Sequence, residues 1–210
     1  MGNLLIKIEA LLASAFHTTA DRLAFGVDKA TYLDLVDIEK PSIPATSIKG
    51  VIRHQVESTL KGFGKNICFS PNPSNMCNSC IICKIFGSPK NPAKLVFYDA
   101  QLMNSTVDSR IGVSINRRRR TAQEEQLFSA EIAFGKRWKT EIKGILPSED
   151  EALVATTLVF IGAKTAFAIG GSNSRGLGWI QLKDFRAYYD QKEFAVKDIK
   201  QKLRELLKNG

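Results

Sequence analysis

The sequence predicts one α+β domain whose elements follow the order strand, helix, two strands, helix, strand. Three observations support this prediction. The opening stretch alternates apolar and polar residues, two later stretches and the tail have helix patterns, and the remaining apolar stretches are short and strand-like. The chain has 210 residues, 44% of them hydrophobic, which is enough for one ordinary core. The predicted order is that of the ferredoxin-like, or RNA-recognition, topology.

The chain begins with a strand pattern and then loses it. Ile6 and Ile8 fall on one face of the predicted strand, and Lys7 and Glu9 fall on the other. These charges interrupt the apolar run before it reaches about 18 residues, so we expect neither a signal peptide nor a membrane anchor. Residues 17–40 show no sustained period, which predicts a long irregular loop. Loops of that length are usually functional or disordered.

The first helix is predicted between Pro44 and Gly62. Pro44 stops the preceding chain, Thr46 or Ser47 can cap the helix, and Gly62 ends it. Four apolar residues recur at i, i+3, i+4 and i+8 and form a narrow stripe: Ile48, Val51, Ile52 and Val56.

Two cations accompany that stripe. Lys49 and Arg53 lie four positions apart and are therefore neighbours on the helix surface. A capped helix start with two cations beside it is a good seat for a phosphate. The alternative is that both side chains only solvate the helix.

The second half of the chain alternates strand and helix patterns. Residues 94–102 are strand-like, and residues 110–146 predict two strands around a highly basic excursion, typical of a protruding hairpin over about 104–137. Residues 149–167 form a helix pattern that is apolar nearly all round, which implies deep burial. Residues 178–185 predict the last strand. The tail predicts a closing helix with four apolar residues on one face: Phe194, Ile199, Leu203 and Leu206.

Basic residues outnumber acidic ones. Thirty Lys and Arg against 21 Asp and Glu give a formal charge of +9. This balance favours polyanionic partners, and nucleic acid is the first expectation. The alternative is a protein with a solvated basic face.

All four cysteines fall between Cys68 and Cys83, with Cys77 and Cys80 between them. This clustering favours a metal site in a reducing compartment, and the cytoplasm is the expected location. Four thiolates close a tetrahedral zinc site and leave no open position, so the site would be structural, in an insertion over about 62–92. A C-x-x-C-x-x-C run also occurs in iron–sulfur proteins, but the proline that typifies them is missing here. A reduced, metal-free set of cysteines is the other alternative.

The predicted hairpin carries four consecutive arginines, Arg117 to Arg120. Like charges at this density normally form a solvated patch, but they become favourable against a phosphate backbone because counterions are released. Phe128 and Phe134 could stack bases there, although packing in the core is the more ordinary role of both.

A glycine-rich stretch, "GGSNSRGLGWI", spans residues 170–180. It has no G-x-G-x-x-G opening a helix, and its place between a helix and the last strand does not suit a dinucleotide fold. Its backbone amides and Arg175 could line a phosphate path, so an RNA backbone is the expected close neighbour of the glycines.

Three separated segments, "IPATSIKGVIRH", "RIGVSINRRRRTA…LFSAEIAFG" and "GGSNSRGLGWI", resemble in order and spacing the RAMP superfamily of CRISPR-associated proteins. They are most similar to the backbone subunit of type III effector complexes. The resemblance covers about residues 17–185, and some members of the group also have a cysteine cluster before an "IFG" stretch.

The resemblance implies a ferredoxin-like palm and a basic thumb hairpin that kinks a guide RNA and flips out a base at regular intervals. It also implies a helical assembly with guide RNA, target RNA and other effector subunits as partners, in antiviral defence. The residues implied to bind RNA come from the first helix, the hairpin and the glycine loop: Ser47, Lys49, Arg53, Arg117, Arg118, Arg119, Arg120, Gly171, Ser172, Asn173, Ser174 and Arg175.

In this family a loop aspartate cleaves target RNA. Asp28 in "FGVD" is similar to the family pattern of a glycine, an apolar residue and an aspartate. An aspartate acts on RNA by activating the ribose 2′-hydroxyl or by orienting a Mg ion at the scissile phosphate, and the product would be a cyclic phosphate. The sequence has "HTTADRL" where the family often has a glycine pair, so Asp34 and Asp37 are alternatives. A catalytically silent subunit is a further alternative.

Two other functions remain open at this point. The first is the guide-processing endoribonuclease of the same superfamily, which also has a glycine-rich loop near its C-terminus. The second is a zinc-bearing structural RNA-binding protein.

Overall fold

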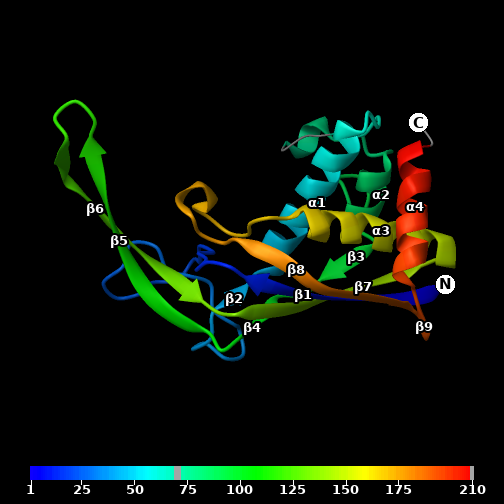
Figure 1. Ribbon diagram of the computed structural model, residues 1–210, viewed down its shortest axis with the longest axis horizontal. Helices are drawn as coiled ribbons and strands as arrows, with labels where there is room; N and C mark the ends of the chain where they lie inside the picture. Colours follow the sequence, from blue (N-terminus) through cyan, green and yellow to red (C-terminus); the bar gives the residue numbers. More distant parts are fainter. Residues whose placement is uncertain (69–71, 209–210) are drawn as a thin grey trace.

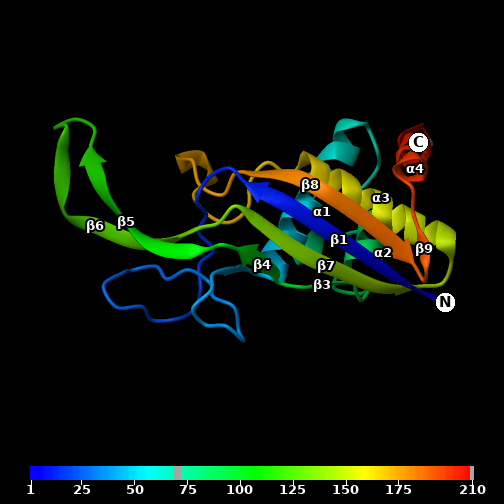
Figure 2. The same ribbon diagram turned by 60° about the horizontal axis from the view of Figure 1, so that its bottom comes forward.

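The computed structural model describes residues 1–68 and 72–208 as a mixed α+β fold. An antiparallel sheet carries the helices on one face (Figures 1 and 2). A long two-stranded hairpin projects from one end of the molecule, and the two chain termini lie at the other end. None of the helices described is long and apolar enough to cross a membrane.

The main sheet is built around β1 (Gly2–Leu12). This strand pairs antiparallel with β7 (Arg137–Leu146) on one side and with β8 (Ile180–Tyr189) on the other. Short strands complete both edges in the order β2-β4-β7-β1-β8-β9, and β3 also pairs with β7. These short strands are β2 (Ser42–Ile43), β3 (Leu95–Phe97), β4 (Ala100–Met103) and β9 (Lys192–Glu193).

The alternation predicted for the opening strand is confirmed. Ile6 and Ile8 are buried against the helices, whereas Lys7 is exposed on the open face of the sheet. The strand begins at Gly2, earlier than the pattern indicated, because its first residues also pair with β7.

Four α-helices are described. The two long ones, α1 (Ala45–Gly62) and α3 (Glu149–Thr165), lie on the same face of the sheet (Figure 1). They approach closely at Gly162, where a Cβ would lie 2.6 Å from the carbonyl oxygen of Ile52. The amphipathic α4 (Val196–Lys208) packs on α3, and the short α2 (Ile81–Phe86) follows the cysteine-rich segment.

The cap predicted for the first helix is wrong. Pro44 is the N-cap residue and offers no side-chain acceptor, while Thr46 and Ser47 lie inside the helix. Asp99, from the loop before β4, supplies the acceptor instead: its Oδ1 lies 2.7 Å from the Ala45 N–H. By contrast, α3 has a local cap, because Ser148 accepts from the N–H of Glu151 at 3.2 Å.

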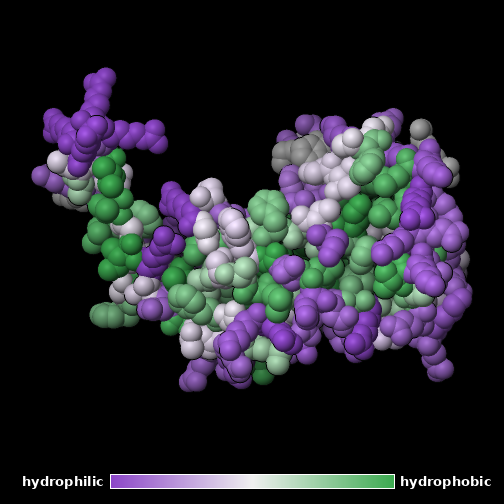
Figure 3. Space-filling view, viewed as in Figure 1, coloured by the Kyte–Doolittle hydropathy of each residue, from purple (hydrophilic) through white to green (hydrophobic). Residues whose placement is uncertain are grey.

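The hairpin consists of β5 (Thr106–Asn116) and β6 (Thr121–Phe134). Asn116 organises the arginine turn between them, since its Oδ1 accepts from the N–H groups of Arg118 and Arg119 at 3.0 and 3.1 Å. The stem is apolar and the tip hydrophilic (Figure 3). The large apolar side chains exposed on the two strands include Ile111, Val113, Ile115, Leu127, Phe128 and Phe134.

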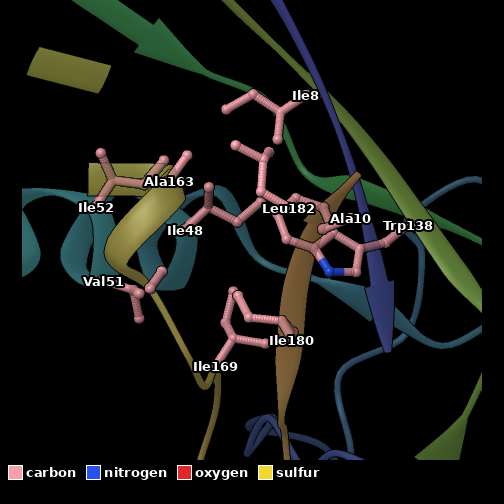
Figure 4. A pocket seen from close by; sticks show the side chains of 11 residues that line it. Ile8, Ala10, Ile48, Val51, Ile52, Trp138, Ala163, Ile169, Ile180 and Leu182 are labelled. Atoms are coloured by element: carbon pink, nitrogen blue, oxygen red, sulfur yellow. The ribbon is translucent and has the colours of Figure 1, made fainter. Parts of the chain in front are cut away.

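The core between the sheet, α1 and α3 contains a small cavity of about 10 Å³ (Figure 4). Its lining is apolar, with Ile8 and Trp138 from the sheet facing Ile48 and Ile52 from α1. A space of this size holds about one water molecule. The cavity is therefore part of the core and has no room for a ligand.

Candidate nucleic-acid interface

The glycine loop packs against the chain segment that follows β1. The N–H of Gly171 donates to the carbonyl of His17, and the N–H of Gly178 donates to that of Ala15, both at 2.7 Å. A Cβ at Gly170 would lie 2.4 Å from the His17 oxygen, and one at Gly178 would lie 1.9 Å from the Ile169 oxygen. Because both glycines also have positive φ, no other residue fits there.

This packing corrects one sequence-based expectation. The close neighbour that Gly170 and Gly178 accommodate is the backbone of the protein itself, and not an RNA backbone. What the loop offers to a ligand is its outer edge, where Asn173–Arg175 form a single 3-10 turn. Gly171, Ser172, Ser174 and Arg175 are exposed on this edge, and Asn173 is half-buried.

A groove of about 350 Å³ separates this outer edge from the stem of the hairpin. Arg110 and Arg175 line it from opposite sides, and Phe128 forms part of its wall. The Phe128 ring lies over Gly112, where a Cβ would be only 2.4 Å from the ring, so the glycine lets the aromatic side chain cross the hairpin. The remaining lining residues are Ile111, Val113, Ser114, Ser172 and Leu177. The groove joins a guanidinium pair to an aromatic surface, which are the two groups that bind single-stranded nucleic acid.

Arg110 is not among the residues that the sequence predicts to bind RNA. The alternation of β5 places Arg110, Gly112 and Ser114 on one face of the strand, so the pattern holds a signal for it. That Arg110 and Arg175 line the same groove depends on the tertiary arrangement of the hairpin and the glycine loop.

The cations on α1 are more enclosed than expected. Arg53 is 16% exposed in its side chain and donates to Glu57 Oε1 at 2.7 Å and to the Gly87 carbonyl at 2.8 Å. Lys49 is half-buried, and burial, followed by the nearby Arg53 charge, lowers the pKa of its ammonium group. Ser47 is also half-buried. Arg53 therefore uses N–H donors for hydrogen bonds within the protein, to Glu57 and to the Gly87 carbonyl.

The arginines at Arg117 to Arg120 lie at the far end of the hairpin, away from the sheet and from α1 (Figures 1 and 3). All four are exposed. The structure thus divides the predicted RNA-binding residues into three groups, one on α1, one at the hairpin tip and one on the glycine loop beside the hairpin stem.

Asp28 lies on a loop that packs along the hairpin. Its Oδ2 accepts from the Ser129 N–H at 2.6 Å and from the Ser129 hydroxyl at 3.1 Å. These hydrogen bonds, the backbone one first, hold the pKa of the Asp28 carboxyl below its ordinary value. The group is exposed and remains a carboxylate at neutral pH.

Asp34 and Asp37 occupy a different place, beside the open face of the sheet. Asp34 Oδ1 accepts from the N–H groups of Val36 and Asp37 at 2.8 and 3.1 Å, an arrangement typical of a turn-forming aspartate. Asp37 pairs with Lys40 at 2.6 Å, and this hydrogen bond lowers the pKa of its carboxyl. Only Asp28 among the three candidates is attached to the hairpin.

The open face of the sheet has a second, wider groove of about 990 Å³. Its charges neutralise one another: Lys7 pairs with Glu141 at 3.6 Å, and Arg186 pairs with Asp184 at 3.0 Å. Glu9 lies 3.5 Å from Lys139 in the same network. The described residues that line this groove therefore lack the uncompensated positive charge that binds a phosphate chain.

The four cysteines converge, although residues 69–71 of their segment lie outside the described residues. Their sulfur atoms all lie within 4.8 Å of one another, with Cys68 at 3.3 Å from Cys83 and 3.6 Å from Cys80. A tetrahedral zinc site with Zn–S bonds of about 2.3 Å separates its sulfurs by about 3.8 Å, so the donor set fits that metal.

The four thiols differ in their surroundings. N–H groups of Ser79 and Cys80 lower the pKa of the exposed Cys77 thiol to about 5, whereas burial raises the pKa of Cys83 to about 12. A bound cation would favour the thiolate form of the whole set.

Comparison with known proteins decides the family. The sequence profile of the RAMP superfamily matches residues 34–181, well over half of the chain. The chain belongs to the RAMP superfamily. The match includes α1, the hairpin and the glycine loop, and it begins at Asp34, after Asp28.

This RAMP protein is also similar to individual relatives. It is 26% identical over 166 residues to the CRISPR system Cms endoribonuclease Csm3 of Methanocaldococcus jannaschii, covering 72% of this chain and 66% of that protein. Its fold matches a chain in the cryo-EM structure of the Type III-B Cmr-beta complex bound to cognate target RNA. That match has a TM-score of 0.64 and 13% identity, over 90% of this chain and 61% of the other. The RAMP chain thus spans just under two thirds of the length of both.

Proposed function

We propose that this protein is a guide-RNA-binding backbone subunit of a type III CRISPR effector complex acting in antiviral defence. Membership of the RAMP superfamily and the similarity to Csm3 support this role. The formal charge of +9 supports a polyanionic partner.

The observation that carries the proposal is the groove between the hairpin stem and the glycine loop. Arg110 and Arg175 can each contact a phosphate from opposite walls, and Phe128 provides an aromatic surface for a base. None of these contacts requires a particular base, because phosphates and ring faces are common to all nucleotides. The groove therefore suits a guide whose spacer sequence is arbitrary.

The body of the protein serves as a ferredoxin-like palm in this proposal, with the hairpin as thumb. The support is the order strand, helix, strands, helix, strand and the central sheet order β4-β7-β1-β8, with α1 and α3 on one face. The exposed apolar stem of the thumb supports an assembly of subunits, because large apolar surfaces mark interaction sites.

Target RNA cleavage is assigned to Asp28 in the same proposal. A carboxylate whose pKa is lowered is a weak base, so Asp28 is better suited to hold Mg²⁺ at the scissile phosphate than to remove the proton of the 2′-hydroxyl. Magnesium commonly binds one or two carboxylates together with substrate phosphates, so a single aspartate suffices for the protein side. The bound ion would stabilise the charge that develops on the phosphate.

The cysteine cluster is proposed to hold a structural zinc ion that fixes the segment between α1 and α2. All four donors would be protein thiolates, which leaves no position for a substrate. Metal analysis of the purified protein should give one zinc per chain, and Cys80→Ser together with Cys83→Ser should abolish it.

Fluorescence anisotropy with two guide RNAs of unrelated spacer sequence tests the main proposal. We expect affinities that agree within about threefold at low ionic strength. A strong preference for one spacer would contradict the proposal. A single metal-independent cut in precursor repeat RNA would instead identify a guide-processing endoribonuclease.

A further inference from the structure

We propose that Glu131 is a positioning residue that fixes the Asp28 loop to the hairpin, so that the hairpin and not the sheet sets where Asp28 lies. This inference rests on the proposed function, because it concerns the orientation of Asp28 for target cleavage. It assigns a role to the Glu131 carboxylate, which does not line the proposed RNA-binding groove.

The side chain of Glu131 is nearly enclosed between β6 and the loop. It is 16% exposed, and its Oε2 pairs with Arg22 Nη2 and accepts from the N–H of Thr31 at 2.8 Å. Thr31 is fully buried, so its N–H would have no water to replace this acceptor. Arg22 in turn donates from Nε to the Thr31 carbonyl at 2.9 Å, which closes a ring of contacts.

The backbone of Glu131 binds the same loop at two more points. Its N–H donates to the Lys29 carbonyl at 2.9 Å, and its carbonyl oxygen lies 2.7 Å from Nδ1 of His17. Because a carbonyl oxygen only accepts, His17 carries its proton on Nδ1, and Nε2 faces the Thr19 hydroxyl at 3.0 Å. One hairpin residue thus contacts the chain at His17, Arg22, Lys29 and Thr31.

These contacts make the loop a closed unit on the hairpin. Its ends are joined where the Ala20 N–H donates to the Ala30 carbonyl at 3.0 Å, so residues 21–29 form a compact loop of the Ω type. Asp28 lies within it and is bound to Ser129. Ser129 and Glu131 are two positions apart on β6 and therefore share one face of the strand. Both anchors of the loop come from the hairpin.

Three variants test the role of Glu131. Glu131→Gln keeps an oxygen for the Thr31 N–H but removes the ion pair, and Glu131→Ala removes both contacts. Arg22→Gln removes the ion pair from the other side, together with the hydrogen bond to the Thr31 carbonyl. Glu124→Gln is the matched control, because Glu124 is an exposed carboxylate on the same strand. The measurements are single-turnover cleavage of a guide-bound target, affinity for guide and target, melting temperature, and hydrogen exchange of residues 20–31.

We expect Glu131→Gln and Arg22→Gln to slow cleavage about tenfold or more, because displacing a catalytic group by about 1 Å can lower the rate about a hundredfold. Affinities for guide and target should stay near those of the wild type, whereas a purely structural role would lower them together with the melting temperature. Glu131→Ala should also speed exchange of the Thr31 amide about tenfold or more. Glu124→Gln should change none of these values.

Two results would overturn the inference. Unchanged exchange in Glu131→Ala would show that the contacts of Glu131 with Arg22 and Thr31, here called the clamp, are absent in solution. Faster exchange with an unchanged, Asp28-dependent cleavage rate would show that the clamp does not position Asp28. If the wild type cuts no target, the proposed cleavage fails and the positioning role fails with it, while exchange still decides whether Glu131 holds the loop.

Discussion

Asp99 and Ala45 are far apart in the chain, yet the carboxylate of Asp99 caps the first helix by accepting the Ala45 N–H at 2.7 Å. Its other oxygen accepts from the Tyr32 hydroxyl at 2.8 Å. Burial, followed by the Asp99 hydrogen bond, raises the pKa of the Tyr32 phenol. One carboxylate thus joins α1 to the long loop that precedes it.

Replacing Asp99 with alanine should lower the free energy of unfolding by about 1–2 kcal/mol, the usual cost of removing a helix cap. Urea unfolding measures this value. Asp21→Ala is the control, because Asp21 is exposed, and it should stay within about 0.5 kcal/mol of the wild type. Equal effects of the two substitutions would show that the Asp99 contact does not stabilise α1.

The glycine loop offers a comparison between two positions with the same kind of backbone. Gly176 and Gly178 both have positive φ, but a Cβ at Gly176 meets nothing within 4 Å, whereas one at Gly178 meets the Ile169 oxygen at 1.9 Å. Alanine at Gly176 should cost about 1 kcal/mol, and alanine at Gly178 should cost at least about 2 kcal/mol more. Thermal unfolding of both variants checks the order, and similar melting temperatures would contradict the close packing described.

The arginine tip should contribute to RNA affinity through charge alone. Replacing Arg117 to Arg120 with alanine should weaken guide binding and flatten the dependence of log affinity on log salt. A control variant with Lys197 and Lys200 replaced removes exposed charge from α4, at the opposite end of the molecule (Figure 1), and should leave the slope nearly unchanged. An unaltered slope in the arginine variant would exclude phosphate contacts at the tip.

Asp28→Ala should abolish target cleavage at regular intervals and leave guide binding intact. Gel analysis of a labelled target measures both the rate and the positions of the cuts. Loss of cleavage in Asp34→Ala or Asp37→Ala, with a normal Asp28→Ala variant, would move the catalytic role to the loop beside the open face of the sheet.

The pH behaviour of Asp28 gives an independent check of its environment. Its pKa is lowered from an ordinary 3.8, so its hydrogen bonds to Ser129 contribute stability above that value and are lost as the pH falls through the lowered pKa. An NMR titration should place the midpoint below 3.8 and show that Ser129→Ala raises it only in part, because the backbone N–H remains. A midpoint above 3.8 would contradict the contact.

The sequence predicts those elements whose residues interact locally. The alternation in β1 and the helix pattern of α3 are both visible in the order of residues. The cap of α1 is not, because its acceptor, Asp99, comes from a distant loop. The roles of Gly170 and Gly178 also depend on which backbone lies beside them, so the sequence shows the need for glycine without showing its cause.

The same distinction applies to the candidate site. Four arginines in a row and four clustered cysteines are conspicuous in the sequence, whereas the groove formed by Arg110 and Arg175 exists only after the hairpin and the glycine loop meet. The clamp at Glu131 is equally invisible, since its contacts reach residues 17–31 across the fold.

Photo-cross-linking of a guide RNA that carries 4-thiouridine along its spacer tests the central claim most directly. If the guide binds in the groove between the hairpin stem and the glycine loop, the cross-linked peptides will map to residues 110–114 and 128 of the hairpin and to residues 172–177 of the glycine loop. Cross-links concentrated instead on the open face of the sheet, around Lys7, Lys139 and Arg186, would contradict it.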